Sequence, residues 1–508
     1  MVNEHPNPRK RFAVNTILSI ASWFFPLALA FIATPIVVRG LGNEQYGVFA
    51  IAIGFVSYAF SSGIGRISAK YIPEFRSSGE PGKISEVVSA TFWLTLAVGV
   101  LQAGALALFA PFLVSDILLV SPDSSKEVVY ALYLASVGGL LLMTSYVFQF
   151  VLQGVHRFDS LALMSSLSAI LLNVGNVVLV VWGYGVWSLL VWNAAVFGFI
   201  GVLYYLSSRR SLPELSFTLN IGKATFVSIS KYASSIVIYQ SLVSVLFIFE
   251  RTWVVRHFGT ETLTFYVIPL MLAFYMHGFI SSVVQVLFPV VNELVNDRER
   301  MIGLYKKATK MVLVVIVFIV GNYICSGRSF LHLWISSEFA DNSYYLLVIL
   351  SLATGLNALG LVVWQLAEAF KHPGLNVLSV VLWLSISIPL MVFAVDRWHS
   401  EGIAIARLIG VLQTIPMILY IEKKFLGRIF WQFWSGIVLR AGIAALLMML
   451  VESQIVRLSE VGWLSLFGAV AAGGMVFVGT LLLVGYFSKE ELAIARNLIF
   501  RKPSGTPA

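Results

Sequence analysis

The feature that most constrains the fold is a succession of about fourteen apolar segments, each 18 to 27 residues long, joined by short connections. A helix needs about 20 mostly apolar residues to cross the roughly 30 Å of hydrocarbon in a bilayer. Because unpaired backbone groups are too costly in lipid, such segments predict spanning α-helices. The predicted spans are residues 15–38, 45–65, 88–110, 128–153, 160–182, 184–206, 229–250, 262–288, 310–327, 344–368, 374–396, 400–421, 435–452 and 463–486.

Composition supports this all-α polytopic membrane fold. Hydrophobic residues make up 58% of the chain and charged residues 12%, against about 25% charged in a typical soluble domain. The longest predicted outer connection, residues 111–127, has room for little more than a short helix, so no large outer domain is expected. The single cysteine, Cys325, excludes an intramolecular disulfide and a thiolate metal cluster. Neither a metal site nor a cofactor is predicted, because no nucleotide-binding or metalloprotease motif is present.

The distribution of basic residues predicts the orientation in the membrane. One set of alternate connections carries 25 of the 34 Lys and Arg residues, the other set carries 7, and Arg407 and Arg440 lie inside spans. Cytoplasmic connections retain positive charge, so both termini are expected in the cytoplasm. Adding or removing one predicted span would move every later connection to the opposite side and mix the two sets. The distribution of basic residues therefore agrees with fourteen spans. The net charge of +9 is therefore interpreted as topological and not as a sign of nucleic-acid binding.

An internal repeat predicts the domain organisation. Residues Val37–Glu44 recur as Val254–Glu261 with five of eight positions identical, and each copy ends one span and begins the next. Chance is the alternative, because Val and Gly are common in this chain. If the repeat is real, two pseudo-symmetric six-helix lobes surround a central cavity and two helices are added at the C-terminal end. The predicted parts are an N-lobe (1–206), an inter-lobe connection (207–228), a C-lobe (229–421) and the added spans with a cytoplasmic tail (422–508).

Cationic side chains within or at the ends of spans are candidate binding residues, because a charge in the bilayer is costly and often functional. Arg66 and Lys70 share one helix face, where like charges repel unless an anion lies between them. Pairing of Lys70 with Glu74 and snorkelling of Arg66 is the structural alternative. Arg407 lies several residues inside a span, where snorkelling is difficult, so a position in a cavity is favoured.

Two carboxylates are candidates for ion coupling. Glu250 precedes Arg251 at the end of span 7, where the two could form part of an anion-binding rim or an ordinary interfacial pair. Glu368 ends span 10, and Lys371 is its expected partner if the residue is only structural.

Amide side chains form two stripes at helical spacing. Gln149 and Gln153 follow one face of span 4, and Asn173 and Asn176 lie on one face of span 5. Such stripes could line a wet cavity that accepts sugar hydroxyls, and hydrogen bonding between packed helices explains them equally well.

Several segments resemble one known family. The run Thr34–Phe49, the sequence Gly63-Ile64-Gly65-Arg66 and the segment Ala69–Glu74 are similar to the opening of polysaccharide flippases of the multidrug/oligosaccharidyl-lipid/polysaccharide exporter superfamily. Residues Glu250–Phe265 and the pair Phe288-Pro289 also resemble the family pattern. The chain departs from that pattern at Glu250-Arg251 and at Thr264-Phe265-Tyr266.

The resemblance implies a transporter and not an enzyme. It implies that the chain moves undecaprenyl-pyrophosphate-linked oligosaccharide units across the bacterial inner membrane by alternating access, for O-antigen or exopolysaccharide export. The expected partners are this substrate, membrane lipid and a polysaccharide polymerase or export machinery, and H+ or Na+ is left open as a coupling ion. Arg66, Lys70, Arg251 and Arg407 are expected to meet the pyrophosphate, and Gln149, Gln153, Asn173 and Asn176 the sugars.

Two other functions remain as alternatives. A drug or metabolite exporter of the same superfamily would favour a cavity lined with carboxylates, whereas Asp and Glu are scarce in the predicted spans. A membrane-embedded glycan polymerase or ligase would require a sizeable outer loop, which the sequence does not predict.

Overall fold

The chain folds into α-helices throughout the part that the computed structural model describes, which is residues 8–492 except 62, 81, 214, 219, 220, 286–290, 292, 293, 489 and 490. No strand occurs among these residues. The predicted pair Phe288-Pro289 and most of the C-terminal tail, with Arg496, Arg501 and Lys502, lie outside the described residues. The helices are α1 (Pro8–Leu41), α2 (Asn43–Ala59), α3 (Arg66–Ser77), α4 (Gly82–Phe112), α5 (Pro122–Gly154), α6 (Phe158–Val181), α7 (Val186–Ser211), α8 (Lys223–Gln285), α10 (Arg298–Trp334), α11 (Ser337–Leu359), α12 (Leu361–Ala369), α13 (Gly374–Val411), α14 (Thr414–Ile421), α15 (Trp431–Leu458) and α16 (Trp463–Leu483), with π-helical turns η1 (Leu113–Ile117) and η2 (Glu422–Leu426).

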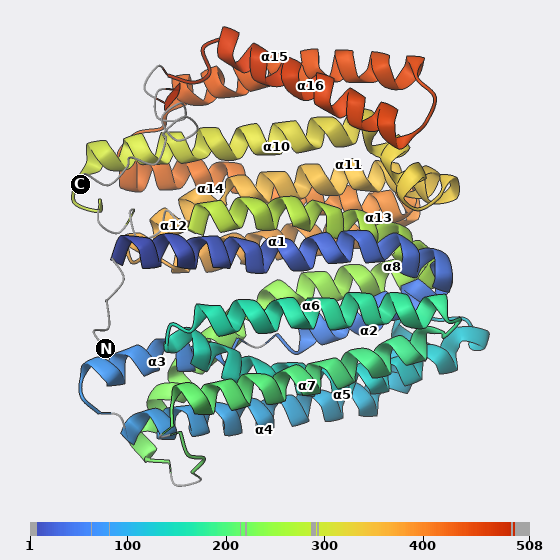
Figure 1. Ribbon diagram of the computed structural model, residues 1–508. Coiled ribbons are helices and arrows are strands. Elements are labelled where there is room, and N and C mark those ends of the chain that lie inside the picture. Colours follow the sequence, from blue (N-terminus) through green and yellow to red (C-terminus); the bar gives the residue numbers. More distant parts are fainter. Residues whose placement is uncertain are drawn as a thin grey trace, which may run out of the picture. The chain divides into compact units, whose positions relative to one another are not determined.

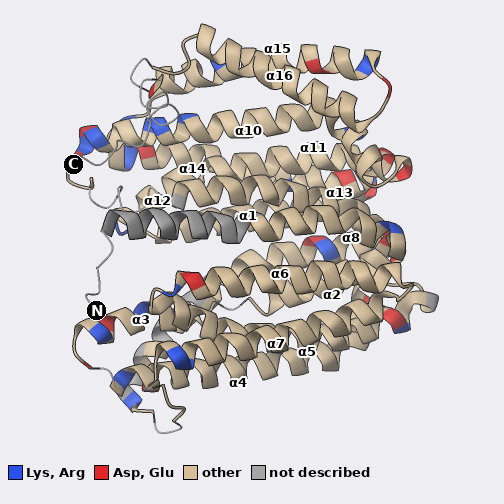
Figure 2. Cartoon of the chain, in the orientation of Figure 1, with Lys and Arg blue, Asp and Glu red and all other residues tan. Residues whose placement is uncertain are grey.

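Ten helical stretches among the described residues are long and apolar enough to cross a membrane. They confirm the prediction of an all-α polytopic membrane protein. In each unit the helices run side by side (Figure 1), and the charged residues gather toward the helix ends (Figure 2). The lengths match the requirement that apolar side chains cover the hydrocarbon while charges reach water. The predicted number of fourteen spans and the two-lobe arrangement remain predictions.

Two of the longest helices are interrupted. A continuous helix of 63 residues, the length of α8, would extend about 95 Å, far more than a bilayer requires. Gly259 in α8 has φ 81° and ψ 178°, a conformation that glycine adopts readily and other residues rarely adopt. In α13 the break lies at Trp398 and His399, and His399 has φ 50°. Each helix therefore consists of two segments.

The two copies of the sequence repeat have similar backbone geometry. Gly42 in the first copy has φ 80° and ψ 162°, close to the values of Gly259 in the second copy. The two turns touch: the Thr264 hydroxyl donates a hydrogen bond of 2.6 Å to the Asn43 carbonyl. A Cβ at Gly47 would lie 1.9 Å from the Thr260 carbonyl oxygen, so only glycine permits this approach. The repeat thus extends to local conformation, although the lobes inferred from it remain untested.

The chain divides into two compact units. Unit 1 comprises Met1–Ile268 and Leu384–Ala406, and unit 2 comprises Pro269–Trp383 and Arg407–Ala508. Both α8 and α13 contribute to each unit, so these units differ from the predicted lobes, whose boundaries are not tested by this division.

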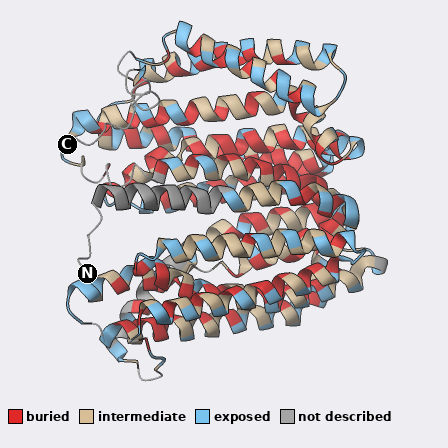
Figure 3. Cartoon of the chain, viewed as in Figure 1, coloured by how far each residue is buried: buried red, intermediate tan, exposed pale blue. Residues whose placement is uncertain are grey.

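Buried residues follow the faces on which neighbouring helices meet, and exposed residues lie on outer faces (Figure 3). In unit 1, α5 packs on α4 and α7, and α1 packs on α6. In unit 2, α10 is central, with α11 and α15 against it and α16 against α15. Leu313, Ala444 and Phe477 belong to the apolar core that joins α10, α15 and α16.

The second predicted span differs from the structure at its end. The apolar run was expected to continue to residue 65, but α2 ends at Ala59, and Arg66 begins the separate helix α3. Gly63, with φ 68°, lies in the connection. This left-handed residue precedes α3, in which the polar residues that follow form a helix of their own.

Candidate functional site

Arg251 lies in α8, half-buried against aromatic rings of unit 1. Its guanidinium carbon is 4.7 Å from the centroid of the Tyr58 ring, and Tyr58 in turn stacks on Phe247 at 4.7 Å. One guanidinium nitrogen, Nη1, donates a hydrogen bond of 3.1 Å to the Phe247 carbonyl. The Nε atom is buried and has no hydrogen-bond acceptor among the described residues. Arginine carries five N–H donors, so this group can still bind an anion.

A glycine creates the space that Arg251 occupies. A Cβ at Gly54 of α2 would lie 2.8 Å from both Cδ and Nε of Arg251. Gly54 and Arg251 also line a small cavity together with Phe55, Leu118 and Thr252. The packing of α2 on α8 thus fixes where the guanidinium lies.

Arg407 occupies the corresponding kind of environment in unit 2. Its side chain is only 2% exposed. The guanidinium carbon lies 5.2 Å from the Trp383 ring and 5.7 Å from the Phe274 ring, distances typical of cation–π contacts. The electron-rich faces of the two rings stabilise a cation at a position where hydration is lost.

A polar pair lies beside Arg407. His277 follows Phe274 by one helical turn in α8, and their rings meet edge to face at 6.4 Å. The Asn357 side chain and the Arg407 guanidinium both lie close enough to the His277 imidazole to influence it. His277 and Asn357 were not identified from the sequence, because a lone His and a lone Asn in apolar helices give no distinctive pattern.

The predicted coupling carboxylates differ in exposure. Glu250 is fully buried, and Glu368 is exposed at the end of α12. Glu368 accepts a hydrogen bond of 2.9 Å from the indole nitrogen of Trp364, instead of the expected contact with Lys371. Trp364 precedes Glu368 by four residues, so the two side chains lie on one helix face.

The four predicted amides occupy different environments. Gln149 is half-buried in α5, and Gln153 is exposed near the end of that helix. In α6, Asn173 donates a hydrogen bond of 2.9 Å to the Ala169 carbonyl of its own helix. The side-chain oxygen of Asn176 is buried and has no donor among the described residues. Asn176 is therefore the member of this set whose side-chain oxygen is buried without a donor among the described residues.

Arg66 and Lys70 lie on the exposed side of α3. The Lys70 ammonium is 4.7 Å from the centroid of the Tyr71 ring. The shared helix face expected from their spacing is present, but on a short amphipathic helix that follows α2.

Two buried carboxylates in unit 2 were not singled out from the sequence. Glu422, fully buried in η2, accepts hydrogen bonds from the Tyr305 hydroxyl at 2.7 Å, the Trp434 indole at 2.8 Å and the Phe430 backbone at 3.1 Å. Glu452 of α15 accepts a hydrogen bond from the Ser326 hydroxyl of α10. Glu422 precedes Lys423 and resembles a loop residue in the sequence, so no signal separated it from a surface charge.

The fold is similar to that of solved membrane transporters. A structure of the lipid II flippase MurJ in an inward closed conformation matches with a TM-score of 0.74 and 14% identity, covering 92% of this chain and 99% of that protein. An inward-facing multidrug resistance MATE family transporter of the MOP superfamily matches with a TM-score of 0.65 and 15% identity, covering 80% of this chain and 99% of that protein. At these identities the likeness establishes the fold alone.

Sequence relatives are proteins of polysaccharide export. A Shigella flexneri protein named as an O-antigen transporter is 21% identical over 413 residues, covering 78% of this chain and 94% of the relative. The succinoglycan biosynthesis transport protein ExoT of Rhizobium meliloti (strain 1021) is 27% identical over 292 residues, covering 56% and 54%. The resemblance to the polysaccharide branch of the exporter superfamily is therefore confirmed. Since the profile of the family described as "Polysaccharide biosynthesis protein" matches residues 36–342 of 508, the chain belongs to the polysaccharide biosynthesis protein family.

Proposed function

We propose that this multi-pass membrane protein is a flippase that moves undecaprenyl-pyrophosphate-linked oligosaccharide units from the cytoplasmic to the outer leaflet of the inner membrane by alternating access. The observation that carries the proposal is Arg407, 2% exposed among aromatic rings of an apolar helical unit, in a chain of the polysaccharide biosynthesis family. An ionisable side chain in such a place suggests a substrate pathway. The names of the relatives support transport of glycan units rather than an enzymatic step.

The chemistry of the substrate matches these residues. A pyrophosphate offers several anionic oxygens, and an arginine can bind two of them through parallel hydrogen bonds. Arg251 and Arg407 each present a guanidinium beside aromatic rings, where water competes less for the anion. Arg66 and Lys70 are exposed on α3 and suit an earlier encounter with the substrate. Asn176, with its buried acceptor oxygen, suits a sugar hydroxyl, as do Gln149, Gln153 and Asn173 in the same helical stripes.

The proposal includes fourteen spans with both termini in the cytoplasm. The ten candidate stretches become twelve when α8 is divided at Gly259 and α13 at His399, and α1 and α2 add two more. An even number places both ends of the chain on one side. Spans 1–6 and 7–12 then form the two pseudo-symmetric lobes, with α15 and α16 as the added helices.

Glu250 is proposed as the residue that binds a coupling H+ or Na+, because it is fully buried and adjacent to Arg251 in sequence. Glu368 is a weaker candidate, since it is exposed and already bound to Trp364. A polysaccharide polymerase is the proposed downstream partner.

Gene deletion with complementation tests the proposal. A strain without the gene is expected to lose surface polysaccharide and to accumulate intact lipid-linked units in the cytoplasmic leaflet, and the wild-type gene should restore export. Arg407→Met, which retains much of the side-chain volume without the charge, should fail to restore it at equal expression, whereas Arg440→Met should succeed. Arg440 is a matched control because its guanidinium binds the Gly485 carbonyl at an exposed position.

Two outcomes would contradict the flippase. Normal glycan export in the deletion strain, together with accumulation of a small cation, would indicate a drug or metabolite exporter. Units that reach the outer leaflet but remain unpolymerised would instead indicate a polymerase or ligase.

A further inference from the structure

One end of unit 2 carries cations that lie on aromatic rings. Lys306 of α10 is 4.4 Å from the centroid of the Phe430 ring, and Arg428 is 5.5 Å from the same ring. Lys424 is 5.6 Å from the Tyr420 ring and 5.4 Å from the Phe425 ring. We call Lys306, Lys424 and Arg428 the basic rim. Among the described residues, none of these three cations forms an ion pair.

Glu422, the acidic residue nearest to Lys424 in the sequence, is buried and forms no ion pair with the basic rim in the described part of the chain. Glu422 lies in the same connection as Lys424 and Arg428, but it points inward and its two oxygens accept hydrogen bonds from Tyr305, Trp434 and the Phe430 backbone. Buried and held by three donors, this carboxylate supports the connection from within. Glu422 is therefore not an ion-pair partner of Lys424 or Arg428.

The backbone of the connection also places the rim. Gly427 has φ 80°, and the Arg298 guanidinium occupies the space where a Cβ would be. Arg298 Nε donates a hydrogen bond of 3.2 Å to the Leu426 carbonyl. This left-handed turn, which lies between Lys424 and Arg428 in the sequence, is thus bound to α10.

Two cations of unit 1 have acidic partners and provide a comparison. Lys83 pairs with Glu80 at 2.9 Å, and Arg157 pairs with Asp159 at 3.0 Å. Those charges are neutralised within the protein.

The surroundings of the rim place it at a membrane surface. Trp431, 62% exposed, and Tyr420, 50% exposed, lie where α15 begins and α14 ends. Exposed Trp and Tyr at the ends of spans are typical of the headgroup region. We propose that the basic rim of unit 2 binds the phosphate groups of anionic phospholipids, with the aromatic rings beside the glycerol and upper acyl chain.

Lipid titration of the full-length protein tests this inference. Detergent-solubilised protein is titrated with phosphatidylglycerol and, separately, with phosphatidylcholine, and bound lipid is counted by native mass spectrometry. The rim variant is Lys424→Gln/Arg428→Gln. Its matched control is Lys83→Gln/Arg157→Gln, which removes the same net charge from cations that already have acidic partners.

The wild-type protein and the control are expected to prefer phosphatidylglycerol. The rim variant should lose roughly fivefold in that preference for each charge removed, or about 25-fold for both. Tyr420→Leu, which removes a ring and no charge, should lose about two- to fivefold. An unchanged preference in the rim variant, or an equal loss in the control, would overturn the proposal. So would full displacement of the lipid by millimolar inorganic phosphate, which would identify a site for free anions. The readout uses no glycan substrate, so it is independent of the outcome for the flippase.

Discussion

Arg251 in unit 1 and Arg407 in unit 2 both lie against aromatic rings, but they differ in how far they are buried. Each guanidinium lies against aromatic rings, Tyr58 for Arg251 and Trp383 with Phe274 for Arg407. Arg251 is half-buried beside a small cavity, whereas Arg407 is 2% exposed. Aromatic faces can therefore hold a cation in an apolar unit both where the cation is half-buried and where it is almost fully buried. We therefore expect substitution of Arg407 to reduce glycan export more than substitution of Arg251.

The largest effect is expected from removing Arg407. Arg407→Met should reduce glycan export roughly 10- to 100-fold, because a hydrogen bond to a charged group contributes about 1.5–3 kcal/mol. Arg407→Lys should recover part of the activity, since it restores the charge but not the planar fork. Export is measured as labelled surface polysaccharide at matched protein level. If Arg251→Met reduces export far more than Arg407→Met does, the expectation that Arg407 is the more important arginine is wrong.

The next largest effect on export is expected from filling the space that Gly54 leaves for the Arg251 side chain. Gly54→Ala places a methyl group 2.8 Å from Arg251 Cδ and Nε, so the side chain must move or the helices must separate, at a cost of about 1–3 kcal/mol. We expect weaker export with a modest loss of thermal stability. Gly104→Ala in α4 is the control, because a Cβ there meets nothing within 4 Å. Equal behaviour of the two variants would show that the position of Arg251 is unimportant.

Changes to the rings test whether the aromatic faces matter at both sites. Tyr58→Leu and Trp383→Leu should each lower export through loss of about 0.5–2 kcal/mol of cation–π attraction, with the larger loss at the more enclosed Trp383. Tyr58→Phe and Trp383→Phe retain a ring and should be milder. The prediction fails if the leucine and phenylalanine variants cannot be distinguished at either site.

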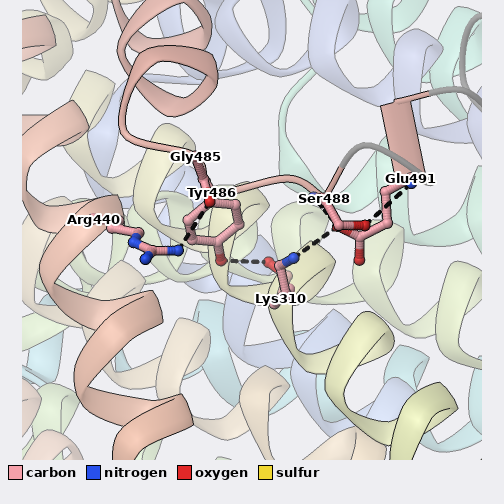
Figure 4. A network of polar contacts seen from close by, with 6 residues as sticks. All are labelled: Lys310, Arg440, Gly485, Tyr486, Ser488 and Glu491. Atoms are coloured by element: carbon pink, nitrogen blue, oxygen red, sulfur yellow. Dashed lines mark hydrogen bonds and ion pairs between the residues drawn. The ribbon is translucent and has the colours of Figure 1, made fainter.

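The smallest effect concerns an attachment in unit 2 that touches neither arginine. Figure 4 shows how the chain after α16 returns to α10: the Lys310 ammonium binds Glu491 at 2.8 Å, the Tyr486 hydroxyl donates to the Lys310 carbonyl, and the Arg440 guanidinium donates to the Gly485 carbonyl. Burial raises the pKa of Glu491, but the bonds from Lys310 and Ser488 outweigh it and leave the pKa below its ordinary value.

Because the folded-state pKa of Glu491 is depressed, its stabilising contribution is present above the unfolded-state pKa and is lost as pH falls through the folded-state value. Glu491→Gln should therefore lower stability by about 0.2–1 kcal/mol at pH 7 and by less at pH 3. Thermal denaturation of the purified protein at both pH values measures this, with Glu80→Gln in unit 1 as the exposed control. A loss that is larger at pH 3 would contradict the assigned direction.

The helical membrane fold followed from the sequence because apolar length is a direct requirement of the bilayer. The repeat was detectable for a similar reason: Gly42 and Gly259 both adopt positive φ, which favours glycine in each copy. The separate helix α3 was not predicted. Hydropathy marks where a chain is apolar, but it does not report that α2 ends at Ala59 or that Gly63 has a positive φ before α3 begins.

The sequence could indicate which residues are unusual, but not their partners. Arg407 was identified from its depth in a span, whereas the rings of Trp383 and Phe274 come from distant parts of the chain. Glu422 was missed because its three donors are brought to it only by tertiary packing. Asn173 illustrates the opposite case, since its helical stripe suggested a cavity while its amide nitrogen bonds to its own helix.

The most direct test of the central claim is a leaflet assay with the purified protein. Full-length protein is reconstituted into liposomes that contain a fluorescent lipid-linked oligosaccharide, and the fraction accessible to an impermeant glycan-modifying reagent is followed with time. The account predicts that wild-type protein transfers the lipid between leaflets faster than empty liposomes and that Arg407→Met does not, while both incorporate equally. Equal transfer by Arg407→Met and wild-type protein, or no transfer by wild-type protein in the presence of either an H+ or an Na+ gradient, would contradict it.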